Sequence, residues 1–164
     1  TEFEAKRIAR WIGEQYPTFQ AFRTATIEHL KQFGYVETHF GRRRYLPGIY
    51  SPLVSDRSKA AREAIIGPIQ GTAADIMKLC LVKLHQHEFF QRGWMKLVMT
   101  IHDELVGQVG PPLLEDDGWP NAAVDNLLTT IADGLLPVRL PMEVGYGPDW
   151  ANCLPLQKIN SLYK

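Results

Sequence analysis

The run MKLVMTIHDELVGQV, residues 95–109, has the clearest structural pattern in the chain. Two short apolar segments, residues 95–101 and 105–109, are typical of buried strands. Three polar residues separate them: His102, Asp103 and Glu104. So short a connection allows only a tight antiparallel hairpin. The sequence therefore predicts a buried hairpin with two adjacent carboxylates at its turn.

These paired carboxylates favour a metal site. Asp103 and Glu104 repel each other, and the apolar residues on either side desolvate them. A divalent cation removes that cost, because Mg²⁺ prefers hard oxygen ligands, and a rigid hairpin suits phosphoryl transfer with two metal ions. A solvated polar turn without any metal explains the same run, and the run by itself leaves both interpretations open.

A second pattern is a basic segment in a chain of zero formal net charge. That balance excludes a protein that binds its partners by overall charge. Between residues 42 and 62 there is one acid, Asp56, and six cations: Arg42, Arg43, Arg44, Arg57, Lys59 and Arg62. Guanidinium groups match phosphate oxygens, so the segment predicts contact with a nucleic-acid backbone. We expect the first three arginines to project freely from a hairpin turn, with a solvated charged turn as the alternative.

A third pattern is QGTAAD, residues 70–75, where small side chains allow a partner to approach a helix closely. That partner is another helix or a strand of nucleic acid. Gln70 has both a donor and an acceptor, which suits the minor-groove acceptors shared by all base pairs. Close helix packing, with Asp75 as a cap, explains the segment equally well.

The remaining chain alternates helical and strand-like patterns. Helical periodicity covers residues 3–33, with Pro17 at the start of a second helix and Gly34 as its C-cap. A hairpin follows over residues 35–46. This order predicts an α+β fold, a small antiparallel sheet packed on long helices.

Further signals set the boundaries of the later elements. Ser55 or Asp56 is expected to cap a helix that begins near Arg57 and ends near Gly93. Pro68 should kink or interrupt it. Two later elements complete the prediction: a helix capped by Asn121, and a last strand over residues 138–144.

Several classes of protein are excluded or disfavoured. There is no run of 18 apolar residues and no apolar N-terminal signal, so we expect neither a membrane span nor secretion. Cys80 and Cys153 lack a partner motif, which indicates idle thiols in a reducing compartment. His39, His85 and His87 do not have zinc-site spacing. The sequence opens inside a helical pattern without an initiator Met, so we interpret it as a piece of a longer chain.

Taken in order, these motifs resemble the C-terminal part of DNA polymerase family A, the polymerase I type. They are GRRRYLP at 41–47, PIQGTAADI at 68–76, IHDELV at 101–106, and EVG followed by DW between 143 and 150. Arg62 lies eight residues before Gln70, as the family pattern requires. The resemblance covers about residues 10–150.

The resemblance implies part of a right-hand polymerase, with residues 1–34 at the rear of the fingers and residues 35–164 in the palm. It implies an enzyme, a DNA-directed DNA polymerase for replication or repair, that uses Mg²⁺, or Mn²⁺ in its place. Asp103 and Glu104 would be the catalytic, metal-binding carboxylates, and His102 would lie near the primer 3′ end. Arg62 and Gln70 would touch the minor groove. The turn that carries Arg42, Arg43 and Arg44, here called the arginine turn, would hold primer-strand phosphates.

The implied partners are primer–template DNA, a deoxynucleoside triphosphate and the remainder of the polymerase. The family's first catalytic Asp and its nucleotide-binding fingers helix have no counterpart in these residues, so we expect the chain to be inactive alone and to self-associate or pair with a complementary fragment. A non-catalytic DNA-binding remnant or subunit and a metal-dependent phosphoesterase are the alternatives. The expected location is intracellular: the cytoplasm at the nucleoid for a bacterial or phage protein, an organelle or the nucleus otherwise.

The chain also departs from the family pattern. An Asn is usual four residues after the position of Arg62, where this chain has Ile66. Ala61 replaces a common Glu, and Thr100 replaces the Gln that usually stands two residues before His102. Loss of these polar side chains predicts a weaker grip on the primer end.

Overall fold

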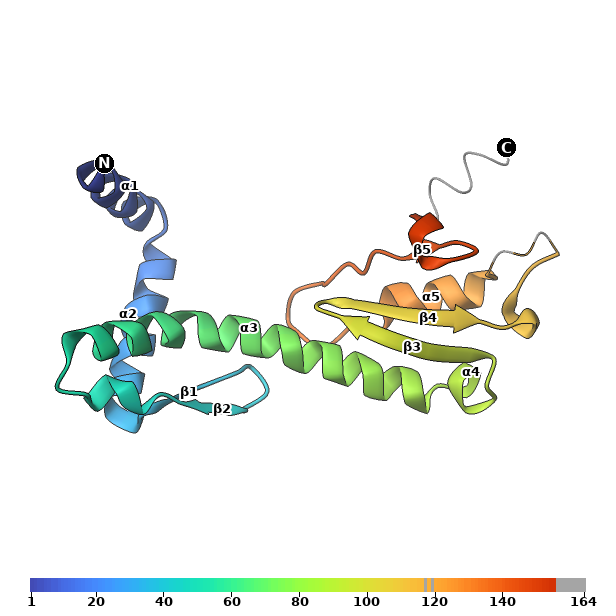
Figure 1. Cartoon of the computed structure of the whole chain (residues 1–164), viewed down its shortest axis with the longest axis horizontal. Helices are drawn as coiled ribbons and strands as arrows, with labels where there is room; N and C mark the ends of the chain where they lie inside the picture. The colour runs from blue at the N-terminus through green and yellow to red at the C-terminus, as the bar shows by residue number, and fades with distance from the viewer. Residues whose placement is uncertain (117, 119, 156–164) are drawn as a thin grey trace. The chain divides into compact units, whose positions relative to one another are not determined.

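The computed structural model describes residues 1–116, 118 and 120–155, and the chain divides into two compact units, residues 1–75 and 76–164 (Figure 1). The first unit contains α1 (Glu2–Gln15), α2 (Pro17–Phe33), β1 (Tyr35–Glu37), β2 (Arg43–Tyr45) and η1 (Pro47–Tyr50). Helix α3 (Val54–Gln86) begins in the first unit and continues into the second.

The second unit adds α4 (Glu88–Gln91), β3 (Met95–Ile101), β4 (Glu104–Val109), η2 (Pro111–Leu113), α5 (Ala122–Thr130), β5 (Gly145–Tyr146), η3 (Trp150–Asn152) and β6 (Leu154–Pro155). The described strands form three separate antiparallel pairs, β1–β2, β3–β4 and β5–β6. The α+β class is therefore confirmed, with three hairpin-like pairs in place of the single small sheet that the sequence predicts.

Both predicted ends of α2 are confirmed. Pro17 occupies the first turn, where its missing N–H removes no helical hydrogen bond. Gly34 ends the helix in the left-handed region, at φ 76°, and its N–H donates to the carbonyl of Leu30. The chain then turns directly into β1, which places the β1–β2 hairpin beside α2.

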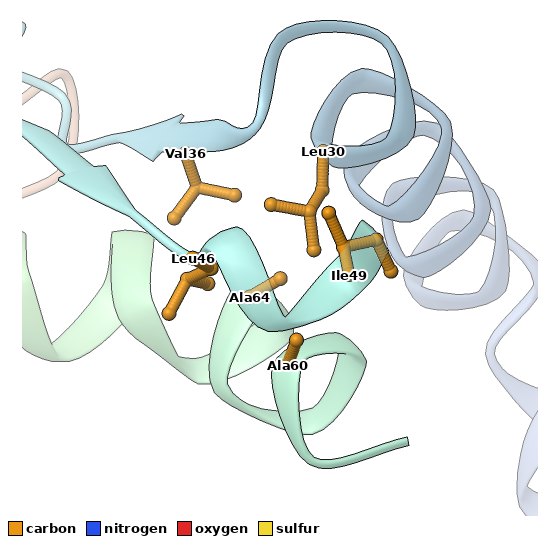
Figure 2. Packing of buried hydrophobic residues seen from close by; sticks show 6 residues of the cluster. All are labelled: Leu30, Val36, Leu46, Ile49, Ala60 and Ala64. Atoms are coloured by element: carbon orange, nitrogen blue, oxygen red, sulfur yellow. The ribbon is translucent and has the colours of Figure 1, made fainter. Parts of the chain in front are cut away.

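The core of the first unit joins three elements to α3, as Figure 2 shows. Its buried members are Leu30, Val36, Leu46, Ile49, Ala60 and Ala64. Leu30 and Ala64 are fully buried, and the small alanine side chains allow the hairpin and η1 to lie close to α3. Truncation of a buried leucine such as Leu30 to alanine typically costs about 2–5 kcal/mol.

Helix α3 differs from its prediction at both ends and at Pro68. It begins at Val54, so Ser55 and Asp56 lie inside its first turn and are not caps. Helix α3 runs through Pro68 without interruption. Proline costs one internal N–H bond there, and Thr72 donates its hydroxyl to the carbonyl of Pro68 at 2.6 Å. The helix ends at Gln86 and not near Gly93, and a separate short helix, α4, lies between these two positions.

By length and composition alone, α3 is apolar enough to cross a bilayer, with a mean hydropathy of 1.3 over its best window. This is weak evidence for a membrane span, because the core helix of a water-soluble protein passes the same test. Helix α3 supplies Ala60 and Ala64 to the core of the first unit, and Cys80 and Leu84 to that of the second.

Two buried clusters hold the second unit together. Val124 of α5 packs with Phe89, Met95, Leu113 and Tyr146. The second cluster brings α3 against the end of α5 through Cys80, Leu84, Ile131 and Ala132. Asn121 caps α5 as predicted, with its side-chain oxygen accepting from the N–H groups of Ala123 and Val124.

Two strand predictions in this unit are wrong. Residues 138–144 form no strand, because Pro141 lacks the N–H that a ladder needs; the last pair instead joins β5 to β6. Strand β3 is not buried: Met95 is, but Leu97, Val98 and Met99 are 41%, 52% and 40% exposed. A two-stranded pair buries a face only where another element covers it, and these three side chains are only partly covered.

Candidate functional site

The β3–β4 hairpin brings the predicted catalytic residues to its tip. Ile101 pairs with Glu104, so Glu104 already belongs to β4 and the turn consists of His102 and Asp103 alone. Met95 pairs with Val109 at the far end, and a register shift between Leu97 and Met99 leaves an irregularity in β3. All three polar side chains at the tip are exposed.

His102 has an unusual backbone conformation. Its φ of 52° makes it the only non-glycine residue with positive φ in the described part of the chain. A two-residue hairpin turn requires positive φ at its first central position, where glycine is the usual choice. The tip of the hairpin therefore holds a histidine at a position that costs about 1–2 kcal/mol for an ordinary residue.

The carboxylates of Asp103 and Glu104 are exposed to solvent, so the predicted burial cost is absent in this chain. Carboxylate oxygens are the donors that Mg²⁺ prefers. However, the described residues contain no group of three or more His, Cys, Asp or Glu side chains that could hold a metal ion. The donor chemistry thus fits a divalent cation, but the number of ligands within this chain does not.

In the first unit the side chains of the arginine turn are held by ion pairs and hydrogen bonds, contrary to the expectation that they project freely. Arg42 donates from Nε to Oδ1 of Asp75 at 2.7 Å and from Nη2 to the carbonyl of Gly71 at 3.0 Å. Arg44 pairs with Glu63 of α3 at 2.7 Å. Two of the three predicted phosphate ligands therefore fasten the hairpin to α3.

Arg43 instead contacts its own hairpin. Its Nε lies 2.7 Å from Oε1 of Glu37, and its guanidinium carbon lies 4.6 Å from the centre of the Tyr35 ring. The hydrogen bond to Glu37 is the largest cause of a raised pKa for Arg43, with Tyr45 and Tyr35 adding to it. Arg43 is therefore a permanent cation on the surface of the hairpin.

The other predicted DNA-binding residues lie on or near α3. Arg57 donates from Nη1 to the carbonyls of Ser51 and Pro52 and so holds the preceding loop. Lys59, Arg62 and Gln70 are exposed. The helical repeat places Arg62 and Gln70 on one side of α3, and Ile66, 48% exposed, lies midway between them.

The small residues of α3 do admit a close partner, and that partner is the β1–β2 hairpin. A Cβ atom at Gly71 would lie 2.6 Å from Cγ2 of Thr38, and one at Gly67 would lie 3.2 Å from Cγ2 of Val36. Asp75, expected as a cap, is instead the ion-pair partner of Arg42. A cavity of about 150 Å³ lies beside Gln70, lined by residues of the hairpin and of α3.

The sequence patterns did not identify the acidic partners of the arginines. Glu37 was detectable, because a hairpin centred on Phe40 places it opposite Arg43. Glu63 and Asp75 gave no such signal, because their pairing depends on how α3 lies against the hairpin. Their contacts with Arg44 and Arg42 appear only in the folded chain.

Comparison with known proteins identifies the family. The model described as DNA polymerase family A matches residues 1–152. The chain belongs to DNA polymerase family A. Within this family it is 37% identical over 149 residues to the thermostable DNA polymerase I of Thermus aquaticus, and 36% identical over 154 residues to DNA polymerase I of Chloroflexus aurantiacus. These alignments cover 90% and 93% of this chain but only 17% and 16% of the two relatives.

A solved family A structure is similar as well. The polymerase domain of Pol1 from M. smegmatis, in complex with DNA primer-template and dNTP, superposes with a TM-score of 0.76 at 29% identity. The match covers 92% of this family A chain and 26% of that one. The family resemblance is thereby confirmed, while the division into fingers (residues 1–34) and palm (residues 35–164) and the roles of single residues stay predictions.

Proposed function

We propose that this family A chain is the C-terminal part of a DNA-directed DNA polymerase, which carries out template-directed nucleotidyl transfer in replication or repair. The observation that carries the proposal is the β3–β4 hairpin, whose two-residue turn exposes Asp103 between paired strands. A hairpin fixes the position of a carboxylate better than a loop does, because both flanking strands are hydrogen-bonded.

We further propose that Asp103 and Glu104 would hold Mg²⁺, or Mn²⁺ in its place, together with ligands from outside this chain. Bound divalent ions would supply the charge stabilisation that phosphoryl transfer needs. This chain's own contribution is to position the two carboxylates at the hairpin tip, with His102 beside them. The lack of a third described ligand supports weak metal binding by the chain alone.

The proposed macromolecular partner is primer–template DNA, with a deoxynucleoside triphosphate as substrate. The similar Pol1 domain was solved with both, which supports the proposal. In this chain the exposed side of α3, with Lys59, Arg62 and Gln70, offers two cations and an amide for a duplex. The proposed site of action is therefore wherever the cell keeps its DNA, the nucleoid in the bacterial or phage case.

The chain is expected to be inactive without the remainder of the polymerase. Two metal ions need carboxylates from more than one element, and the developing negative charge needs a cationic group at the triphosphate. The test is primer extension with this chain alone, with an upstream family A segment alone, and with both mixed. Products from the mixture only would support the proposal. Template-dependent products from this chain alone would contradict the expectation that it is inactive without the remainder of the polymerase.

A non-catalytic DNA-binding remnant is the second candidate, favoured by the solvent-exposed carboxylates and the absence of a three-ligand group among the described residues. The same mixing experiment separates the two. A remnant would bind duplex DNA but would give no extension with any upstream segment. A phosphoesterase that uses His102, Asp103 and Glu104 is less well supported, because it too needs a further acidic ligand.

A further inference from the structure

The three consecutive arginines of the turn do not share one face. Side chains alternate along an extended strand, so Arg42 and Arg44 point one way and Arg43 the other. The contacts follow this alternation. Arg42 pairs with Asp75 of α3 and Arg44 pairs with Glu63 of α3. Arg43 pairs with Glu37 across the hairpin. The cross-strand register agrees, because Glu37 lies directly opposite Arg43.

Arg42 is built into the junction between the hairpin and α3. It donates to Asp75 and to the carbonyl of Gly71, and its own N–H donates to the hydroxyl of Thr38 at 3.1 Å. The side chain of Asp75 is only 10% exposed. Removal of the guanidinium would break the ion pair between the hairpin and this largely buried carboxylate, and breaking such a pair is unfavourable.

Arg43 is in the opposite situation. Its side chain is 52% exposed and that of Glu37 is 38% exposed, so their ion pair is largely solvated. Exposed ion pairs contribute little to stability. A phosphate oxygen can replace the Glu37 carboxylate at little cost, because Arg binds either anion through the same planar fork.

We propose that the arginine turn is divided in function: Arg43 binds a DNA phosphate by exchanging it for the carboxylate of Glu37, whereas Arg42 is a positioning residue that holds α3 and its exposed Gln70 against the hairpin. The proposal rests on the duplex binding proposed above and assigns that binding to one arginine of the three-residue set. Glu37 then competes with the phosphate for the guanidinium of Arg43.

The test compares the whole chain with single variants on a labelled primer–template duplex, measured over a series of salt concentrations. Arg43→Gln should make the negative slope of log affinity against log salt less steep by about 0.9, the value for one lost phosphate contact. The unfolding midpoint should be unchanged. Glu37→Gln should raise affinity several-fold at low salt. Arg42→Gln should leave the salt slope unchanged and lower the unfolding midpoint by about 4–8 °C.

Arg92 offers a matched control. It is an exposed arginine that pairs with Glu88 at 3.3 Å and lies 4.8 Å from the centre of the Trp94 ring, so its surroundings imitate those of Arg43. Arg92→Gln removes the same charge and should not change the salt slope. If Arg42→Gln fails to fold, Arg42→Lys replaces it, because lysine keeps the charge but loses the fork that holds Asp75 and Gly71.

The outcomes distinguish failure of the proposed division among the arginines from failure of the proposed duplex binding. An unchanged slope for Arg43→Gln, or a loss of slope by a folded Arg42 variant equal to that of Arg43→Gln, overturns the division while duplex binding stands. No duplex binding by the unsubstituted chain overturns the proposed DNA contact and the division together. A midpoint that is unchanged in both Arg42 variants contradicts the positioning role of Arg42.

Discussion

Glu104 lies directly opposite Ile101 in the β3–β4 ladder, so that one member of the carboxylate pair belongs to a strand and the other, Asp103, to the turn. Only Glu104 is paired in the β3–β4 ladder, whereas Asp103 lies in the turn, so the two carboxylates have different surroundings although they are adjacent in sequence. This arrangement makes Asp103 the better candidate for the principal metal ligand.

Asp103→Asn tests that assignment, because it keeps the shape of the side chain but removes its charge. In the chain alone, Mn²⁺ should broaden the amide signals around the turn weakly, and the variant should abolish the effect. In a mixture with an active upstream segment, primer extension should fall by more than about 1,000-fold. The exposed Asp116 provides the control, since Asp116→Asn should change neither result. Extension within a few-fold of the parent chain would rule out the assignment.

His102→Gly should stabilise the second unit by about 0.5–1 kcal/mol, because glycine adopts the positive φ of this position without strain. His102→Val should have the opposite effect, because a β-branched residue tolerates that conformation least. Denaturant unfolding measures both variants. Equal stability of the two would show that the turn conformation in solution differs from the one described.

Gly71→Ala should destabilise the first unit by about 1–3 kcal/mol, since the new Cβ would overlap Cγ2 of Thr38. The double variant with Thr38→Ser removes the opposing methyl group but keeps the hydroxyl that accepts from Arg42. Partial recovery in the double variant, measured as a double-mutant cycle, would show that the clash is local. A double variant no more stable than Gly71→Ala alone would locate the damage elsewhere.

The second unit should lose stability at alkaline pH because of Tyr146. Burial raises the pKa of its phenol, and the negative charge of Asp125 raises it further. The folded state therefore favours the protonated phenol, so the stabilisation is complete below the unfolded pKa of about 10 and is lost as the pH rises above it. Tyr146→Phe should show a shallower alkaline loss of unfolding free energy. An identical pH profile in the two proteins would exclude this residue as the cause.

Self-association is the expected result of the exposed aromatic residues in α1 and α2. Phe3, Trp11 and Phe19 are 75%, 57% and 43% exposed, whereas Phe22, which belongs to the same helical pattern, is half-buried. Exposed apolar patches drive association. Trp11→Glu should therefore shift sedimentation of the chain toward the monomer, and an unsubstituted chain that is monomeric at high concentration would contradict the expectation.

The periodicity and capping signals predicted local structure well where one short-range rule decides it. Pro17, Gly34 and Asn121 occupy the helix termini that their chemistry favours, and β3 covers the seven residues that its apolar run predicts. Prediction failed at residues 138–144, where a strand-like run contains Pro141, and at Pro68, where α3 continues without the interruption that proline favours.

The candidate site shows the same division. The sequence by itself determined the α+β class, the hairpin with His102, Asp103 and Glu104 at its tip, and the basic segment, because each depends on residues close together in the chain. Tertiary structure alone decided that Arg42 is held by Asp75, 33 residues away, and that Arg44 is held by Glu63, while Arg43 stays exposed beside Glu37. The physical reason is that alternation along a strand gives each side chain a direction, but only the packing of α3 against the hairpin determines what lies in that direction.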